Sequence, residues 1–130
     1  MSERVDDIVL VDDEPMVAEF VRRVLRRSAL GLRHFAEPEA ALEYLRGHSA
    51  RVLLVDTRMP GMHGPELLAA LAREGRLGET HVFLCSAGRV MPDEYPLPEL
   101  PHLQRLSKDE LFDRSTLLER LVPPAEGRAA

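Results

Sequence analysis

Short apolar runs, most of which end beside a polar residue, are the feature that most constrains the fold of this chain. Five such runs occur, three of them clear and two weaker, at residues 8–11, 51–55 and 81–85, and at 32–35 and 102–106. Continuous runs rich in Val and Leu are typical of strands that are buried on both faces, as in a parallel sheet. The pattern therefore predicts five strands, most of them interior.

Apolar residues between these runs repeat every three and four positions, which is the spacing of one face of a helix. Four helical faces are present, at residues 16–25, 41–45, 67–71 and 117–122. Strand–helix alternation with short connections predicts an α/β fold with an open, doubly wound parallel sheet. The start of the last helix stays open, because Ser107 and Glu110 have the spacing of a capping box while Asp113 or Ser115 could cap a later start.

Prolines interrupt the alternation between the fourth and fifth runs. Residues 87–101 contain four of them, Pro92, Pro96, Pro98 and Pro101. Each proline inside a helix costs about 3 kcal/mol, so no long helix fits there. We expect a loop with at most one turn of helix at residues 88–91.

Length and composition limit the class of protein. The chain has 130 residues, a net charge of −5 and one cysteine. We expect a single domain at residues 1–130, with a core at about 6–122 and a short tail at 123–130. The chain shows no apolar leader or membrane span, and its acidic charge argues against a nucleic-acid partner. A single cysteine cannot form an internal disulfide, which favours a cytoplasmic location.

Polar residues follow four of the five runs. They are Asp12, Asp13, Asp56, Ser86 and Lys108. In an open α/β sheet, ligands bind beyond the carboxyl ends of the strands, where these side chains would meet. Taken singly, each residue is also compatible with a solvated turn or an ordinary surface position. Their joint occurrence at strand ends indicates a site.

The chemistry of this set favours an anion held beside a metal ion. Three neighbouring carboxylates repel one another and their pKa values rise unless a cation lies among them, and Mg²⁺ prefers oxygen ligands. Ser86 can donate a hydrogen bond to an anionic oxygen. Lys108 is the single lysine beside sixteen arginines, and its compact ammonium suits a tight site. Such an assembly suits a phosphorylated aspartate, since aspartate is a known nucleophile in phosphoryl transfer.

Four motifs together resemble the receiver domain of bacterial two-component response regulators, of the chemotaxis-Y kind. They are Ile8-Val-Leu-Val-Asp-Asp-Glu-Pro15, Asp56-Thr-Arg-Met-Pro-Gly-Met-His-Gly64, Cys85-Ser-Ala87 and Lys108. The resemblance covers residues 6 to about 122. It implies a flavodoxin-like fold, with a five-stranded parallel sheet and helices on both faces.

The resemblance also implies a role for each site residue. Asp56 would accept a phosphoryl group from a sensor histidine kinase or a histidine phosphotransfer protein. Ser86 would hydrogen-bond a phosphoryl oxygen, and Lys108 would pair with Asp56 and the phosphoryl group. The Mg²⁺ ligands would be Asp12 (directly or through water), Asp13, Asp56 and the backbone carbonyl of Arg58.

Four positions depart from the family pattern. The family's fourth helix falls in the proline-rich segment, so we expect it to be reduced or missing. Arg105 stands where an aromatic residue is usual, Asp109 follows the lysine where proline is usual, and His63 replaces a common Asp or Ser. The first three departures lie on the surface that receivers commonly use for output.

The expected function is a receiver that signals through an unidentified downstream protein. It would catalyse only its own phosphorylation and dephosphorylation, so it is not expected to be a metabolic enzyme. About eight residues follow Val122, too few for a DNA-binding output domain. Two alternatives stay open: an interaction module that works without phosphorylation, and an intermediate phosphorelay carrier, which needs the site but no output switch.

Overall fold

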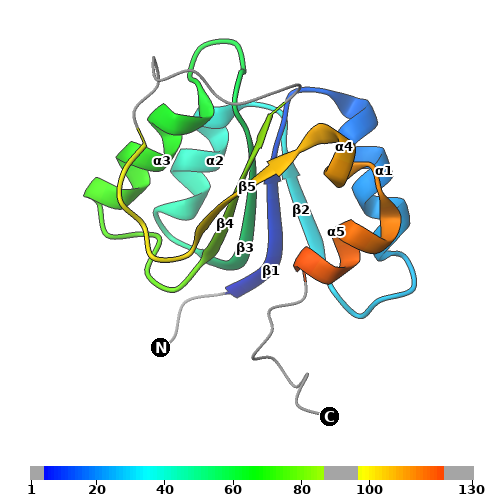
Figure 1. Cartoon of the computed structure of the whole chain (residues 1–130). Coiled ribbons are helices and arrows are strands. Elements are labelled where there is room, and N and C mark those ends of the chain that lie inside the picture. Colours follow the sequence, from blue (N-terminus) through cyan, green and yellow to red (C-terminus); the bar gives the residue numbers. More distant parts are fainter. Residues whose placement is uncertain (1–4, 87–96, 122–130) are drawn as a thin grey trace.

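The computed structural model describes residues 5–86 and 97–121, which form a five-stranded parallel sheet with helices on both faces (Figure 1). The strand order is β2-β1-β3-β4-β5. The strands are β1 (Val5–Val11), β2 (Leu32–Phe35), β3 (Ser49–Asp56), β4 (His81–Ser86) and β5 (Leu103–Ser107). The predicted α/β architecture is confirmed, and the strand positions differ from the apolar runs by three residues or fewer.

The helices divide between the two faces of the sheet. They are α1 (Pro15–Leu25), α2 (Pro38–Leu45), α3 (Gly64–Arg73), α4 (Lys108–Leu111) and α5 (Arg114–Leu121). Figure 1 shows α1, α4 and α5 on one side and α2 and α3 on the other. Among the described residues, no helix is long and apolar enough to cross a membrane.

Two core clusters explain why residues 8–11 of β1 and 52–55 of β3 are apolar at every position. Ile8 and Leu10 of β1 belong to the cluster under α1 and α5, while Val9 and Val11 belong to the cluster under α2 and α3. Strand β3 divides its side chains between the same two clusters. Because successive side chains of a strand point to opposite faces, a strand covered on both faces needs an uninterrupted apolar run.

Helices α1 and α2 begin in the same way. Glu14 and Glu37 occupy the N-cap positions, neither side chain makes a capping hydrogen bond, and each is followed by a proline at the start of its helix. Proline is tolerated there because the first helical N–H groups have no partner within the helix.

The chain after β5 uses both of the helix starts that the sequence left open. The Ser107 hydroxyl accepts a hydrogen bond from the Glu110 N–H at 3.0 Å, and the Ser107 N–H donates to the Glu110 carboxylate at 3.0 Å. This capping box begins the short helix α4. Asp113 then accepts from the Thr116 N–H at 3.0 Å and caps α5. Lys108 is therefore the first residue of a helix.

The connection from β4 to β5 contains no helix in its described part. Residues 97–100 have no regular secondary structure, and residues 101–102 form a turn. Leu97 and Leu100 pack against the cluster under α2 and α3. The expected helical turn at residues 88–91 lies outside the described residues. Residues 97–101 form no helix, and the rest of the segment in which no long helix is expected lies outside the described residues.

The strand order fixes where a ligand would bind. The chain leaves β1 to form β2 on one side and then returns to form β3 on the other side. A crevice forms beyond the carboxyl ends of two strands at such a reversal. Asp12 follows β1 and Asp56 ends β3, so the topology places both carboxylates at this point.

Candidate functional site

Three carboxylates meet beyond the carboxyl ends of β1 and β3. One carboxylate oxygen from each of Asp12, Asp13 and Asp56 lies within 4.8 Å of the others. Asp12 and Asp56 are buried, whereas Asp13 is exposed. The three carboxylates thus meet at one edge of the sheet, as the sequence predicted, and the structure adds that the cluster has a buried floor and one side open to solvent.

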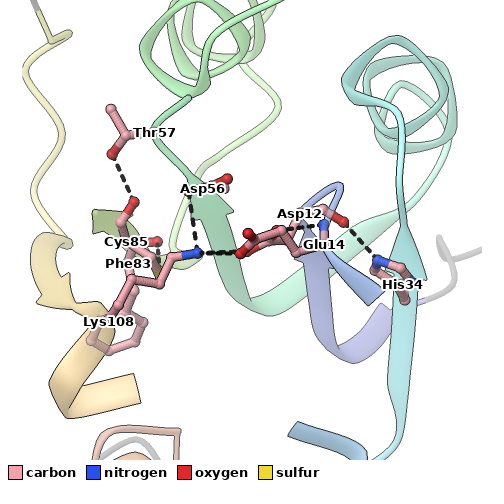
Figure 2. Close-up of polar contacts among 8 residues, drawn as sticks. All are labelled: Asp12, Glu14, His34, Asp56, Thr57, Phe83, Cys85 and Lys108. Carbon is pink, nitrogen blue, oxygen red and sulfur yellow. Dashed lines mark hydrogen bonds and ion pairs between the residues drawn. The ribbon is translucent and has the colours of Figure 1, made fainter. Parts of the chain in front are cut away.

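Backbone contacts hold Asp12 in place. Its N–H donates to the carbonyl of Phe35 at 3.1 Å, and its side-chain oxygen accepts from the Glu14 N–H at 2.9 Å. On the neighbouring strand β2, the His34 Nε2 atom lies 2.8 Å from the Asp12 carbonyl oxygen (Figure 2). No polar residue follows this strand directly, so the sequence alone does not place a polar group here. The residue that could have indicated this contact is His34, the second-last residue of β2.

Asp56 is fixed through the residue that follows it. The Thr57 N–H and hydroxyl both donate to the carbonyl of Cys85 on β4, at 2.9 and 2.7 Å. The chain then turns back, so that the Gly64 N–H donates to the Thr57 carbonyl at 2.9 Å. A Cβ atom on Gly64 would collide with the backbone oxygen of Asp56. Glycine is therefore required where α3 begins against the end of β3.

Lys108 brings one positive charge into the cluster. Its Nζ atom lies 3.3 Å from an Asp12 oxygen, 3.4 Å from a Glu14 oxygen and 3.6 Å from an Asp56 oxygen. Figure 2 shows the ammonium between Asp56 on one side and Asp12 with Glu14 on the other. The predicted pairing of Lys108 with Asp56 is thus found in the structure. The contact with Glu14 was not anticipated.

Burial and crowding shift the pKa values of these groups. Burial, with the nearby charge of Asp12, raises the pKa of Asp56 to about 6, although Lys108 opposes the shift. Burial also raises the pKa of Asp12, against the Glu14 N–H and Lys108. For Lys108, burial lowers the pKa, but the surrounding carboxylates outweigh it and the net shift is upward. A further positive charge beside these carboxylates would therefore favour their charged forms.

The donor set fits a hard divalent cation. Three carboxylates, those of Asp12, Glu14 and Asp56, lie within 3.6 Å of a single ammonium, and Asp13 adds a fourth negative charge beside Asp12 and Asp56. Burial and the charge of Asp12 raise the pKa of Asp56 even with Lys108 at 3.6 Å, so a further cation would favour its charged form. Carboxylate oxygens are the ligands that Mg²⁺ and Ca²⁺ prefer, so the cluster could hold such an ion.

The other predicted site residues, Ser86 and Arg58, lie at the end of β4 and just after β3. Ser86 ends β4 and is half-buried, and its backbone partner on β5 is Ser107. Arg58 is exposed in the loop after β3. Cys85 is buried, and its burial raises the pKa of the thiol to about 12. The cysteine is therefore a core residue, as expected, and not a reactive thiolate.

Comparisons with known proteins agree with the fold. The family model described as the response regulator receiver domain matches residues 8–121. The response regulator GtcR of Aneurinibacillus migulanus is 30% identical over 70 residues, which cover 54% of this chain and 29% of that protein. The match thus spans less than a third of the curated relative.

Two solved structures show the same architecture. A CheY-like receiver domain protein of Methanospirillum hungatei is 22% identical, with a TM-score of 0.70 over 89% of this chain and 90% of the other. The chemotaxis protein CheY4 of Vibrio cholerae is 20% identical, with a TM-score of 0.72 over 90% and 96%. At these identities the likeness concerns the fold.

Proposed function

The chain belongs to the response regulator receiver domain family, and we propose that it accepts a phosphoryl group on a carboxylate oxygen of Asp56. Receiver domains are signalling phosphoacceptors rather than classical enzymes. The observation that carries the proposal is the buried carboxylate of Asp56, with two further carboxylates within 4.8 Å and the ammonium of Lys108 at 3.6 Å.

The proposed step is an in-line phosphoryl transfer. An Asp56 oxygen forms a bond to phosphorus while the bond from phosphorus to the donor's histidine nitrogen breaks. The imidazole leaves with the electron pair and takes a proton from solvent, so no oxidant or reductant is needed. Lys108 would stabilise the charge on the phosphoryl oxygens, and the Ser86 hydroxyl would donate a hydrogen bond to one of them.

Magnesium is the proposed metal. Its ligands would be Asp12, Asp13, Asp56 and the backbone carbonyl of Arg58. The ion would offset the negative charge that the phosphoryl group brings beside the acidic residues. Asp12 would be a metal ligand of fixed position, because the backbone contacts described above hold it at the end of β1. Asp13 would be the ligand next to it in the chain.

The proposed partners are a sensor histidine kinase or histidine phosphotransfer protein upstream and a protein target downstream. We further propose that residues 1–130 act as one receiver domain, with catalysis limited to its own phosphorylation and dephosphorylation. A cytoplasmic location stays a prediction.

Intact mass spectrometry tests the phosphoacceptor directly. The protein is incubated with Mg²⁺ and acetyl phosphate, and we expect a mass gain of one phosphoryl group. The gain should be lost in Asp56→Asn and kept in the control Asp109→Asn, which changes an exposed aspartate of α4. If neither acetyl phosphate nor any histidine kinase produces an adduct, the chain would instead be an interaction module that works without phosphorylation.

An intermediate phosphorelay carrier is the second candidate, and Arg105 favours it. Arg105 lies exposed on β5, at the position where receivers usually carry the aromatic residue of the output switch. A relay carrier needs the phosphorylation site but no such switch. In this case a purified histidine phosphotransfer protein removes the label from Asp56 faster than hydrolysis does. Loss of the label at the hydrolysis rate alone would contradict the relay.

A further inference from the structure

The ammonium of Lys108 lies closer to the two carboxylates that follow β1 than to the carboxylate at the end of β3. Its Nζ atom donates hydrogen bonds to Asp12 at 3.3 Å and to Glu14 at 3.4 Å. The Asp56 oxygen lies farther away, at 3.6 Å, in an ion pair. An ammonium has three N–H donors, so two of the three are directed away from the proposed phosphoacceptor.

Glu14 reaches Lys108 from the solvent side of the cluster. Its side chain is 64% exposed, whereas that of Lys108 is 16% exposed and that of Asp12 is 1% exposed. The backbone of Glu14 is nevertheless fixed, because its N–H donates to Asp12 and the next residue begins α1. Glu14 is therefore a carboxylate on an anchored backbone whose side chain can leave without opening the core.

We infer that Glu14 is a positioning residue that tethers Lys108 toward β1 while Asp56 is unmodified. The proposed role of Lys108 in pairing with a phosphoryl group requires the ammonium to move from Glu14 toward Asp56. Glu14 therefore competes with the phosphoryl group for the same cation. The tether itself rests on the observed contacts, and only its effect on phosphorylation rests on the proposed function.

The sole lysine of the chain makes the tether measurable without phosphorylation. An amine-acylating reagent can modify only Lys108 and the N-terminal amine, and peptide mapping separates the two. The Glu14 carboxylate accepts a hydrogen bond from this ammonium and so limits the reagent's access to it. In Glu14→Gln, we expect the acylation rate at Lys108 to rise about two- to fivefold, the range that exposed ion pairs give.

Two variants test whether Glu14 acts through its direct contact with Lys108 or only through its negative charge. Glu14→Asp keeps the charge but shortens the side chain by one methylene, so a tether is lost and acylation approaches the rate in Glu14→Gln. Glu37→Gln is the matched control, because Glu37 occupies the N-cap position of α2 as Glu14 does that of α1 and is also followed by proline. Its acylation rate should equal that of the wild type. An unchanged rate in Glu14→Gln, or a wild-type rate in Glu14→Asp, overturns the tether.

The phosphorylation rate gives the second readout. With Mg²⁺ and acetyl phosphate, Glu14→Gln and Glu14→Asp should be phosphorylated about two- to fivefold faster than wild type and Glu37→Gln. The increase should vanish when each is combined with Lys108→Met, since Glu14 acts through Lys108. Equal rates in wild type and Glu14→Gln overturn the competition. A wild type that takes no phosphoryl group contradicts the proposed function, while the acylation rates still decide the tether.

Discussion

The Nζ atom of Lys108 lies 3.3 Å from Oδ2 of Asp12 although the strands that these residues follow are not neighbours. Strands β3 and β4 lie between β1 and β5 in the sheet. Neighbouring strands are about 4.8 Å apart, so the two strand ends are separated by roughly 14 Å along the sheet. The side chain of Lys108 thus crosses the end of β4 and connects the two sides of the site.

Removing this ammonium should destabilise the protein in the absence of metal. The pKa of Lys108 is raised by folding, so the stabilisation is fully present at neutral pH and is lost only as pH rises through that raised pKa. We expect Lys108→Met to lower the free energy of unfolding by about 1–2 kcal/mol at pH 7 in a chelating buffer. Urea denaturation measures the change.

The exposed ion pair of Arg23 and Glu19 provides the control for Lys108. Its side chains are 65% and 67% exposed, so Arg23→Met should leave the urea midpoint nearly unchanged. Added Mg²⁺ should recover part of the loss in Lys108→Met, because a cation then returns to the carboxylates. A loss of the same size with and without Mg²⁺ would contradict this account.

Asp56 should oppose folding at neutral pH when no metal is bound. Folding raises its pKa from 3.8 to about 6, so its favourable contribution is present below the unfolded pKa and is lost as pH rises through about 6. Asp56→Asn should therefore raise the free energy of unfolding by about 2 kcal/mol at pH 7.5 in a chelating buffer. The difference from wild type should shrink toward zero at pH 4.

Urea denaturation across this pH range, with and without Mg²⁺, measures the effect of Asp56. Magnesium should stabilise the wild type more than Asp56→Asn, because the neutral amide removes one anionic ligand. If Asp56→Asn is no more stable than wild type at pH 7.5, the buried carboxylate carries no unfavourable charge and the electrostatic description of the site is wrong.

The sequence predicted those parts of the site that depend on strand ends. Asp12, Asp13 and Asp56 come together because parallel strands bring their carboxyl ends to one edge, which a single sequence can indicate. The contacts of Glu14 and His34 could not be predicted in this way. They depend on how far the Lys108 ammonium reaches and on the register of β2 against β1, and neither leaves a spacing signal.

The helix starts after β5 show a second limit of sequence reasoning. Ser107 and Asp113 were competing caps for one helix in the sequence, whereas in the structure each caps its own. Local capping patterns identify possible starts but not how many are used, because that depends on whether Leu111 and Leu117 can both be buried. Both are, and so the segment divides into two helices.

Gly64 should tolerate no side chain. A Cβ atom there would collide with the backbone oxygen of Asp56 and crowd the side chains of Val55 and Leu84. A backbone atom can move aside only if the strand or helix shifts. We therefore expect Gly64→Ala to lower the free energy of unfolding by about 2–3 kcal/mol. Phosphorylation of Asp56 should slow as well, since the colliding atom belongs to the acceptor residue.

Gly47 gives a matched control for this substitution. A Cβ atom at Gly47 would meet no other atom within 4 Å, so Gly47→Ala should leave stability and phosphorylation close to wild type. Chemical denaturation and intact mass spectrometry compare the two variants. Equal stability of Gly64→Ala and Gly47→Ala would show that α3 can shift away from β3.

The capping box of α4 should control the reach of Lys108, because Lys108 follows Ser107 directly and begins the helix. Ser107→Ala and Asp113→Ala each remove a cap and should each cost about 1 kcal/mol of unfolding free energy. Since only Ser107→Ala frees the backbone beside Lys108, only this variant should also slow phosphorylation of Asp56. Denaturation measures the first effect and the rate with acetyl phosphate the second. Equal slowing in both variants would mean that general destabilisation, and not the position of Lys108, sets the rate.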